Sequence, residues 1–237
     1  MVAASPASGS ALEQIRKEAE QGDAWAQHNL GWMYDKGEGV PEDDAEAVRW
    51  YRMAAEQGLA GAQYNLGWMY DKGEGVPEGD AEAVRWYRKA AEQGLAGAQN
   101  NLGLMHDRGE GVPEDDAEAV RWYRMAAEQG LAEAQYNLGG MHDRGEGVPE
   151  DDAEAVRWYR MAAEQGDAGA QYMLGVMYGK GEGVPQDPVF AHMWFNLAGA
   201  AGFDGASDVR DTIEKIMTRA ELSEARKRAR EWFEARP

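Results

Sequence analysis

The chain has 237 residues, of which 43% are hydrophobic, and its 24 basic and 43 acidic side chains give a net charge of −19. This hydrophobic content is sufficient for a folded core and argues against a disordered chain. Because the chain has no cysteine, disulfides, thiolate metal sites and cysteine nucleophiles are excluded. The strong negative charge argues against nucleic acid as a partner, since phosphate binding requires clustered Lys and Arg. No apolar run approaches the roughly 18 residues of a membrane span, so we expect no membrane insertion.

The first ten residues, MVAASPASGS, have no hydrophobic segment of the kind found in a signal peptide. We expect residues 1–10 to form a disordered N-terminal stub. Residues 11–22 end in Glu-Gln-Gly, like the second half of each repeat that follows, but they carry Gln14 and Glu18 where later copies have tryptophan and alanine. Polar residues at these positions suit an outer face, so we predict an N-terminal capping helix over residues 11–22.

A 36-residue period dominates the chain from residue 23 to residue 202. The segment GEGVP recurs at positions 37, 73, 109, 145 and 181, and the segment AEAVRWYR recurs at positions 45, 81, 117 and 153. A repeat of this length is typical of a solenoid built from helical units. We therefore predict an all-α, right-handed solenoid (superhelix) with five helix-turn-helix repeats over residues 23–202 and capping helices at both ends.

Each repeat is predicted to begin with a helix of about 13 residues, which in the first copy spans residues 24–36. Ala26, Leu30, Met33 and Tyr34 fall on one side of this helix and form a core stripe. Gly37 is expected to end the helix, because glycine readily takes the left-handed conformation that follows a helix terminus.

The second helix of the first copy is predicted to run from about residue 43 to the residue before Gly58. Asp43 and Glu46 have the spacing of a helix-capping box. The inner face of this helix is predicted to consist of Ala47, Trp50, Tyr51 and Ala54.

Residues 203–237 depart from the repeat and are predicted to form C-terminal capping helices. One helix is expected over about 206–217, and Thr218 with Glu221 has the spacing of a capping box that opens a last helix to about residue 235. Trp232 and Phe233 are expected to seal the end of the core.

The pattern A-x-A-Q-x-x-L-G-x-M-Y-x-x-G-x-G-V-P-x-D, followed by A-x-x-W-Y-x-x-A-A-E-Q-G, closely resembles the Sel-one-like repeat family and covers residues 24–202 in five copies. The resemblance implies helix-turn-helix units related to the tetratricopeptide repeat, in an adaptor that binds proteins or peptides. Bacterial members often act in envelope biogenesis, signalling or host interaction. The resemblance therefore favours an exported or periplasmic bacterial protein, with the cytoplasm as the alternative.

One face of the first helix varies among these otherwise near-identical repeats. In the first copy it comprises positions 25, 28, 29, 32 and 36, which form a band about 100° wide. In solenoids of this kind the first helices usually line the concave side. The candidate ligand-binding residues on this band are Trp25, His28, Asn29, Trp32, Lys36, Tyr64, Asn65, Trp68, Lys72, Asn100, Asn101, Arg108, Tyr136, Asn137 and Tyr172.

These residue types suit the recognition of a protein segment. Trp25, Trp32 and Trp68 are the tryptophans outside the repeated core site and the cap, and tryptophan is enriched at interface hot spots. We expect the asparagines to hydrogen-bond an extended peptide. The row of basic residues beside them is expected to attract an acidic segment, and it comprises Lys36, Lys72, Arg108, Arg144 and Lys180. Packing against the neighbouring repeat and pairing with adjacent acids explain the same residues, so both interpretations stay open.

We therefore predict a non-catalytic, monomeric adaptor scaffold that recognises a protein or peptide partner of unknown identity in the concave groove. One alternative is the binding of a carbohydrate or cell-wall component through the same aromatic residues. A second alternative is an engineered, consensus-like array without a ligand.

No group of residues in the array suits catalysis. Between residues 11 and 206 there is no Ser, Thr or Cys, so a catalytic triad has no nucleophile. His106 and His142 occupy a position that is tyrosine in other copies, and we interpret them as core residues. The acidic loops lack the spacing of a calcium-binding loop and suit helix capping. We expect no catalytic residue, no metal site and no cofactor, and we do not expect an enzyme.

Overall fold

The computed structural model describes residues 9–235, and within this range the chain forms thirteen helices and no strand. The predicted all-α arrangement of helix-turn-helix repeats is therefore confirmed. The chain divides after Asp115 into two compact units. Residues 1–8 of the expected N-terminal stub lie outside the described residues, whereas Gly9 and Ser10 belong to the first helix. No helix in the described range is both long and apolar enough to cross a membrane.

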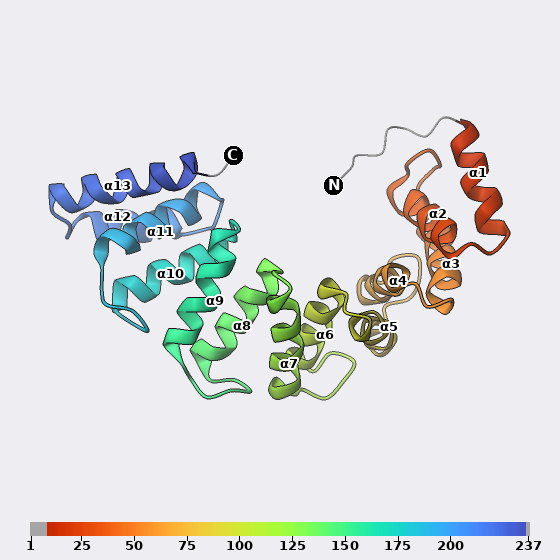
Figure 1. The fold of residues 1–237 in the computed structure, drawn as a ribbon, viewed down its shortest axis with the longest axis horizontal. Helices are drawn as coiled ribbons and strands as arrows, with labels where there is room; N and C mark the ends of the chain where they lie inside the picture. Colours follow the sequence, from red (N-terminus) through yellow and green to blue (C-terminus); the bar gives the residue numbers. More distant parts are fainter. Residues whose placement is uncertain (1–8, 236–237) are drawn as a thin grey trace. The chain divides into compact units, whose positions relative to one another are not determined.

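The first unit contains six helices, and each helix packs against the next one along the chain (Figure 1). Its helices are α1 (Gly9–Glu20), α2 (Ala24–Lys36), α3 (Asp44–Glu56), α4 (Ala60–Lys72), α5 (Asp80–Glu92) and α6 (Ala96–Arg108).

The second unit contains seven helices. Consecutive helices from α7 to α11 pack together, and α11 contacts both of the last two helices. The helices of this unit are α7 (Asp116–Glu128), α8 (Ala132–Arg144), α9 (Asp152–Glu164), α10 (Ala168–Lys180), α11 (Pro188–Ala200), α12 (Ala206–Glu214) and α13 (Arg219–Glu234).

The helix ends follow from their capping residues. The Asp43 side chain accepts a hydrogen bond from the Glu46 backbone N–H at 3.1 Å, which satisfies a free donor at the start of α3. Gly37 takes the left-handed conformation after α2, and its N–H donates to the Met33 carbonyl oxygen. At the start of α13 the capping box predicted from Thr218 is present in both directions.

Glycine at the loop of one repeat permits close contact with the preceding repeat. Gly75 has a φ of 66°, and a Cβ placed on it would lie 2.2 Å from the Asp44 carbonyl oxygen at the start of α3. Only glycine fits this combination of backbone conformation and space. The loop after α4 is therefore fixed against the preceding repeat by backbone contact.

A buried glutamine provides a second connection between successive helical pairs. The Gln27 side chain donates to the Ala19 carbonyl oxygen at 3.1 Å, and it accepts from the Gln57 side chain at 2.7 Å. The same pattern recurs one period later, where Gln63 donates to the Ala55 carbonyl oxygen. In both repeats the first helix is thus joined to the end of the preceding helix by the same glutamine hydrogen bond.

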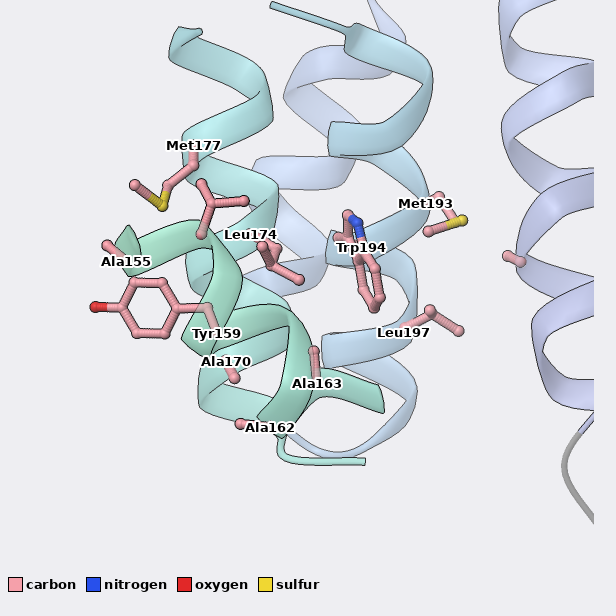
Figure 2. Close-up of a cluster of buried hydrophobic side chains, with 12 residues drawn as sticks. Ala155, Tyr159, Ala162, Ala163, Ala170, Leu174, Met177, Met193, Trp194 and Leu197 are labelled. Carbon is pink, nitrogen blue, oxygen red and sulfur yellow. The ribbon is translucent and has the colours of Figure 1, made fainter. Parts of the chain in front are cut away.

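Each unit has its own hydrophobic core. In the first unit Tyr51 of α3, Leu66 of α4 and Trp86 of α5 are buried in one cluster. In the second unit Figure 2 shows Leu174 of α10 and Trp194 of α11 in the cluster that α9, α10 and α11 share. The predicted core stripes of both helix types are therefore confirmed where these side chains are buried.

Candidate functional site

The variable band of the first helices divides into three classes by exposure. The exposed candidates are Trp25, Asn29, Lys36, Lys72 and Arg108. The half-buried candidates are His28, Trp32, Tyr64, Asn65, Trp68, Asn101, Tyr136, Asn137 and Tyr172. Asn100 is only 1% exposed, so its side chain is not offered to a ligand on this face.

Five of the candidates line one pocket in the first unit. The pocket has a volume of about 210 Å³ and lies between α2 and α4, with α3 behind it. We call it the Trp32–Trp68 pocket. It is lined by Trp32, Asp35, Lys36, Tyr51, Tyr64, Asn65, Trp68 and Met69.

Its tryptophan walls are supported by the core. Trp32 of α2 and Trp68 of α4 both pack against the buried cluster of the first unit while they remain half-buried. The two residues occupy equivalent positions in successive repeats, where later repeats carry Leu104, Gly140 and Val176. Tryptophan at this position is therefore specific to the first two repeats.

A polar network forms one side of the pocket. The Tyr51 hydroxyl donates to Asp35 Oδ2 at 3.2 Å, and the amide of Asn65 donates to the same hydroxyl. Burial, followed by the neighbouring Asp35 carboxylate, raises the pKa of Tyr51 well above its ordinary value. Tyr51 therefore stays protonated and holds one oxygen of Asp35 in place.

Asn65 also connects the pocket to the first turns of α2. Its Nδ2 lies 3.1 Å from Nε2 of His28, so the amide donates and the imidazole nitrogen accepts. Burial lowers the pKa of His28 below its ordinary value, which favours the neutral ring that this hydrogen bond requires. The asparagine predicted to bind a peptide backbone is thus engaged within the fold.

Lys36 closes the pocket with its own charge. Its Nζ lies 3.2 Å from Asp35 Oδ1 and 5.8 Å from the centroid of the Trp68 ring. The Lys36 side chain is 49% exposed, whereas that of Asp35 is 11% exposed. The more exposed lysine therefore covers the more buried carboxylate.

The remaining basic residues of the predicted row also face acids of the chain. Lys72 pairs with Asp71 at 3.0 Å, and Lys180 pairs with Glu182 at 3.2 Å. The two arginines of the row pair with glutamates of the following loops. These pairs are exposed and contribute little stability, but they neutralise the row that was expected to attract an acidic segment.

The aromatic residues one turn earlier hold neighbouring helices together. The Tyr64 ring lies 5.8 Å from the Tyr87 ring, and a Cβ added to Gly97 of the next repeat would lie 3.5 Å from the Tyr64 ring. The small residue at position 97 is thus covered by the aromatic ring of the preceding repeat. The packing interpretation accounts for this part of the band.

In the second unit the predicted residues serve packing as well. The Tyr136 ring lies 5.8 Å from the Tyr159 ring, and the Tyr172 ring stacks on Phe203 at 4.6 Å. At Gly140, where the first two repeats have tryptophan, an added Cβ would lie 2.9 Å from Nη1 of Arg144. The Arg144 side chain therefore occupies space beside Gly140 that a larger side chain at this position would need.

Sequence reasoning missed three residues of the Trp32–Trp68 pocket, Asp35, Tyr51 and Met69. All three recur in other copies, as with Asp71, Tyr87 and Met105, and they were therefore interpreted as structural. Asp35, Asp44 and Glu74 also bring carboxylate oxygens to within 4.8 Å of one another. Acidic groups therefore lie close together near Asp35. The residue spacing along a single helix does not predict this, because the three residues come from different elements.

The repeat pattern matches a known family. The Sel1 repeat model matches residues 26–59, 60–95, 96–131, 132–167 and 168–203, which is well over half of the chain. The chain belongs to the Sel1 repeat family. Sel1 repeat scaffolds are typical of adaptors for protein–protein interaction and are generally non-catalytic.

Solved Sel1 repeat structures share this fold. A protective antigen of uropathogenic Escherichia coli with an SLR fold is 39% identical, with a TM-score of 0.84, over 92% of this chain and 48% of that chain. The chain thus spans about half the length of this relative. A Sel1 repeat protein from Oxalobacter formigenes is 38% identical, with a TM-score of 0.82, over 95% of this chain and 89% of that chain.

More distant relatives share the fold alone. An immunity protein from Pseudomonas aeruginosa is 23% identical, with a TM-score of 0.51, over 83% of this chain and 75% of that chain. A comparison with curated proteins finds no match.

Proposed function

We propose that this Sel1 repeat protein is a non-catalytic, monomeric adaptor that binds a protein or peptide segment on the exposed face of α2 and α4. The observation that supports this proposal is the Trp32–Trp68 pocket, in which two half-buried indole rings flank polar groups in a surface depression. Tryptophan in such a setting provides a large apolar contact that becomes fully desolvated when a partner binds. The pocket is the proposed anchor point of the interface.

The surface extends from the pocket towards the start of α2. Trp25 is 65% exposed, and its ring meets the His28 ring edge-on at 6.3 Å. Asn29 is exposed on the same helix. An exposed indole beside a half-buried pair offers a partner segment a second apolar contact along one continuous helix face.

The size of the pocket favours one side chain of a larger partner as its occupant. Its volume of about 210 Å³ is below the roughly 300–1,000 Å³ of sites that enclose small molecules. A protein segment that inserts one side chain and lies across the neighbouring surface fits this description. A sugar that stacks on the same rings would need a broad exposed ring face, which Trp25 provides and the half-buried pair provides less well.

Replacement of both tryptophans by leucine tests the proposal. Leucine is the residue that the chain itself uses at the equivalent position 104, so the Trp32→Leu/Trp68→Leu variant is expected to fold. Both proteins would be applied to an array of random peptides and to a glycan array, with circular dichroism as the folding control. We expect peptides that bind the parent protein and not the variant.

Two outcomes would contradict the proposal. Peptide binding that is equal for both proteins would remove the pocket from the interface. Binding that is confined to glycans and lost in the variant would replace the peptide ligand with a carbohydrate.

A further inference from the structure

We infer that the Trp32–Trp68 pocket receives a cationic side chain, a lysine or arginine of the partner segment, and that Lys36 occupies its place in the unbound protein. This inference rests on the proposed function, because it names the side chain that a bound segment inserts. It reverses the expectation that the band attracts an acidic segment.

The position of Lys36 is the first argument. Its ammonium lies against Asp35 at 3.2 Å and faces the Trp68 ring at 5.8 Å, which are the two contacts that a bound ammonium would need. Trp rings are the best aromatic partners for cations, and the attraction grows when the cation is desolvated. The chain itself therefore demonstrates that the pocket accommodates a cation.

Lys36 is also displaceable. Its side chain is 49% exposed, so it has room to turn away into solvent, and an exposed ion pair is worth little. A lysine or arginine from a partner would approach from outside and place its aliphatic stem between the two indole rings. It would gain apolar contact with both rings.

The carboxylate that would bind the cation is fixed by the fold. Asp35 is largely covered, and the Tyr51 hydroxyl holds its Oδ2, which leaves Oδ1 to the cation. A fixed acceptor loses little conformational entropy when a ligand binds. The tyrosine stays protonated because its pKa is raised, so this support persists across the physiological pH range.

The charge around the pocket supports the same sign of ligand. Asp44 and Glu74 place carboxylate oxygens within 4.8 Å of that of Asp35. Three carboxylates therefore lie close together, and Lys36 pairs with Asp35. The whole chain carries a net charge of −19, which attracts basic segments and repels acidic ones at long range. The basic row offers an acidic segment no excess charge, because its members pair with acids of the chain.

Small neutral and charged probes test the inference without a known partner. The indole N–H signals of Trp32 and Trp68 would be assigned in ¹⁵N spectra with the single leucine variants. The protein would then be titrated with the N-acetyl amides of lysine, arginine, norleucine and glutamate. We expect saturable shifts of both indole signals with lysine and arginine, and much weaker shifts with norleucine and glutamate.

Two variants sharpen the result. Asp35→Asn keeps an acceptor for the Tyr51 hydroxyl but removes the charge, and it should abolish the preference for lysine over norleucine. Lys36→Met keeps the aliphatic stem but removes the internal competitor. It should tighten binding of the lysine probe about two- to fivefold, which corresponds to the free energy of an exposed ion pair.

The outcomes separate this inference from the proposed function. Equal shifts with norleucine and lysine, or stronger shifts with glutamate, would overturn the cation site. On the peptide array, lysine and arginine of each bound segment would also be replaced by norleucine. If binding still requires both tryptophans but is unchanged by this replacement, the adaptor function is retained and the cation site is rejected. If no peptide requires the tryptophans, the proposed function itself fails.

Discussion

His28 of the first repeat and Asn65 of the second are joined by a 3.1 Å contact between Nε2 of the imidazole and Nδ2 of the amide. The contact links α2 to α4, two helices that α3 separates in the chain. It requires an unprotonated Nε2, since both atoms would otherwise be donors. A polar bond between repeats is thus tied to the protonation state of one histidine.

This bond predicts a pH dependence of the first unit. Burial lowers the pKa of His28 in the folded state below the ordinary 6.5, so the unfolded state binds the proton more readily. The stabilising contribution is fully present above pH 6.5 and is lost as the pH falls through the lowered pKa. Urea unfolding at pH 7.5 and pH 5.5 measures it.

A tyrosine variant is the control for this prediction. Tyr64 occupies the position equivalent to His28, so His28→Tyr is expected to fold and to lose less stability between the two pH values. Equal losses in the parent and the variant would show that other groups cause the acid sensitivity.

Replacement of His142 by tyrosine is predicted to stabilise the second unit. His142 is buried, and burial lowers its pKa. In the next repeat Tyr178 occupies this position and accepts a hydrogen bond from Arg160 at 2.7 Å. Arg124 stands at the same distance in sequence from residue 142, so the new hydroxyl should gain about 0.5–1.5 kcal/mol.

The measurement for His142→Tyr is the midpoint of urea unfolding at pH 7.5 and at pH 5.5. We expect a higher midpoint in the variant, with a larger advantage at the lower pH because the histidine must otherwise be protonated. A lower midpoint at both pH values would mean that the site is shaped for the smaller ring.

Trp50 and Trp32 should respond very differently to substitution. Trp50 is 6% exposed and packs with Ala19 and Leu30 in a second buried cluster of the first unit. Its replacement by alanine should cost about 3–5 kcal/mol through lost contacts and a cavity. Trp32→Leu should cost less than about 1.5 kcal/mol, because a half-buried surface ring is replaced by another apolar residue. Comparable losses in thermal unfolding would contradict the assignment of Trp32 to a binding surface.

The loop glycine Gly75 can be compared with a matched control, Gly58. Both have positive φ, but a Cβ on Gly58 would have no atom within 4 Å, whereas one on Gly75 would overlap the Asp44 carbonyl. Gly58→Ala should cost about 1–2 kcal/mol from backbone strain alone. Gly75→Ala should cost at least about 1 kcal/mol more because the loop must move away. Equal destabilisation in chemical unfolding would show that the loop contact is dispensable.

The repeat architecture was predictable because its signals are local and recur. The first helix was expected over residues 24–36, and α2 has these bounds. Asp43 and Thr218 indicated where helices begin, because their side chains accept hydrogen bonds from backbone N–H groups within the first turn. Trp50 and its equivalents were recognisable as core residues because they fall on the same face as small alanines in every copy.

The site was less predictable because its properties depend on neighbouring repeats. Asn100 looked like a surface asparagine, yet it is buried. The basic residue Lys36 was expected to attract acids, but its charge is directed at Asp35. Neither relation follows from helical periodicity, which places residues on a face without saying what covers that face.

The glutamine bonds that join one helical pair to the next have a consequence for how such chains change in length. Gln63 donates to the Ala55 carbonyl oxygen, and Gln99 donates to the Ala91 carbonyl oxygen, through the same two atoms at the same distance of 3.1 Å. Because each junction is chemically identical, the loss or duplication of one 36-residue block would leave junctions of the same kind on either side. Recombination between near-identical copies could then lengthen or shorten the gene without an intermediate that fails to fold.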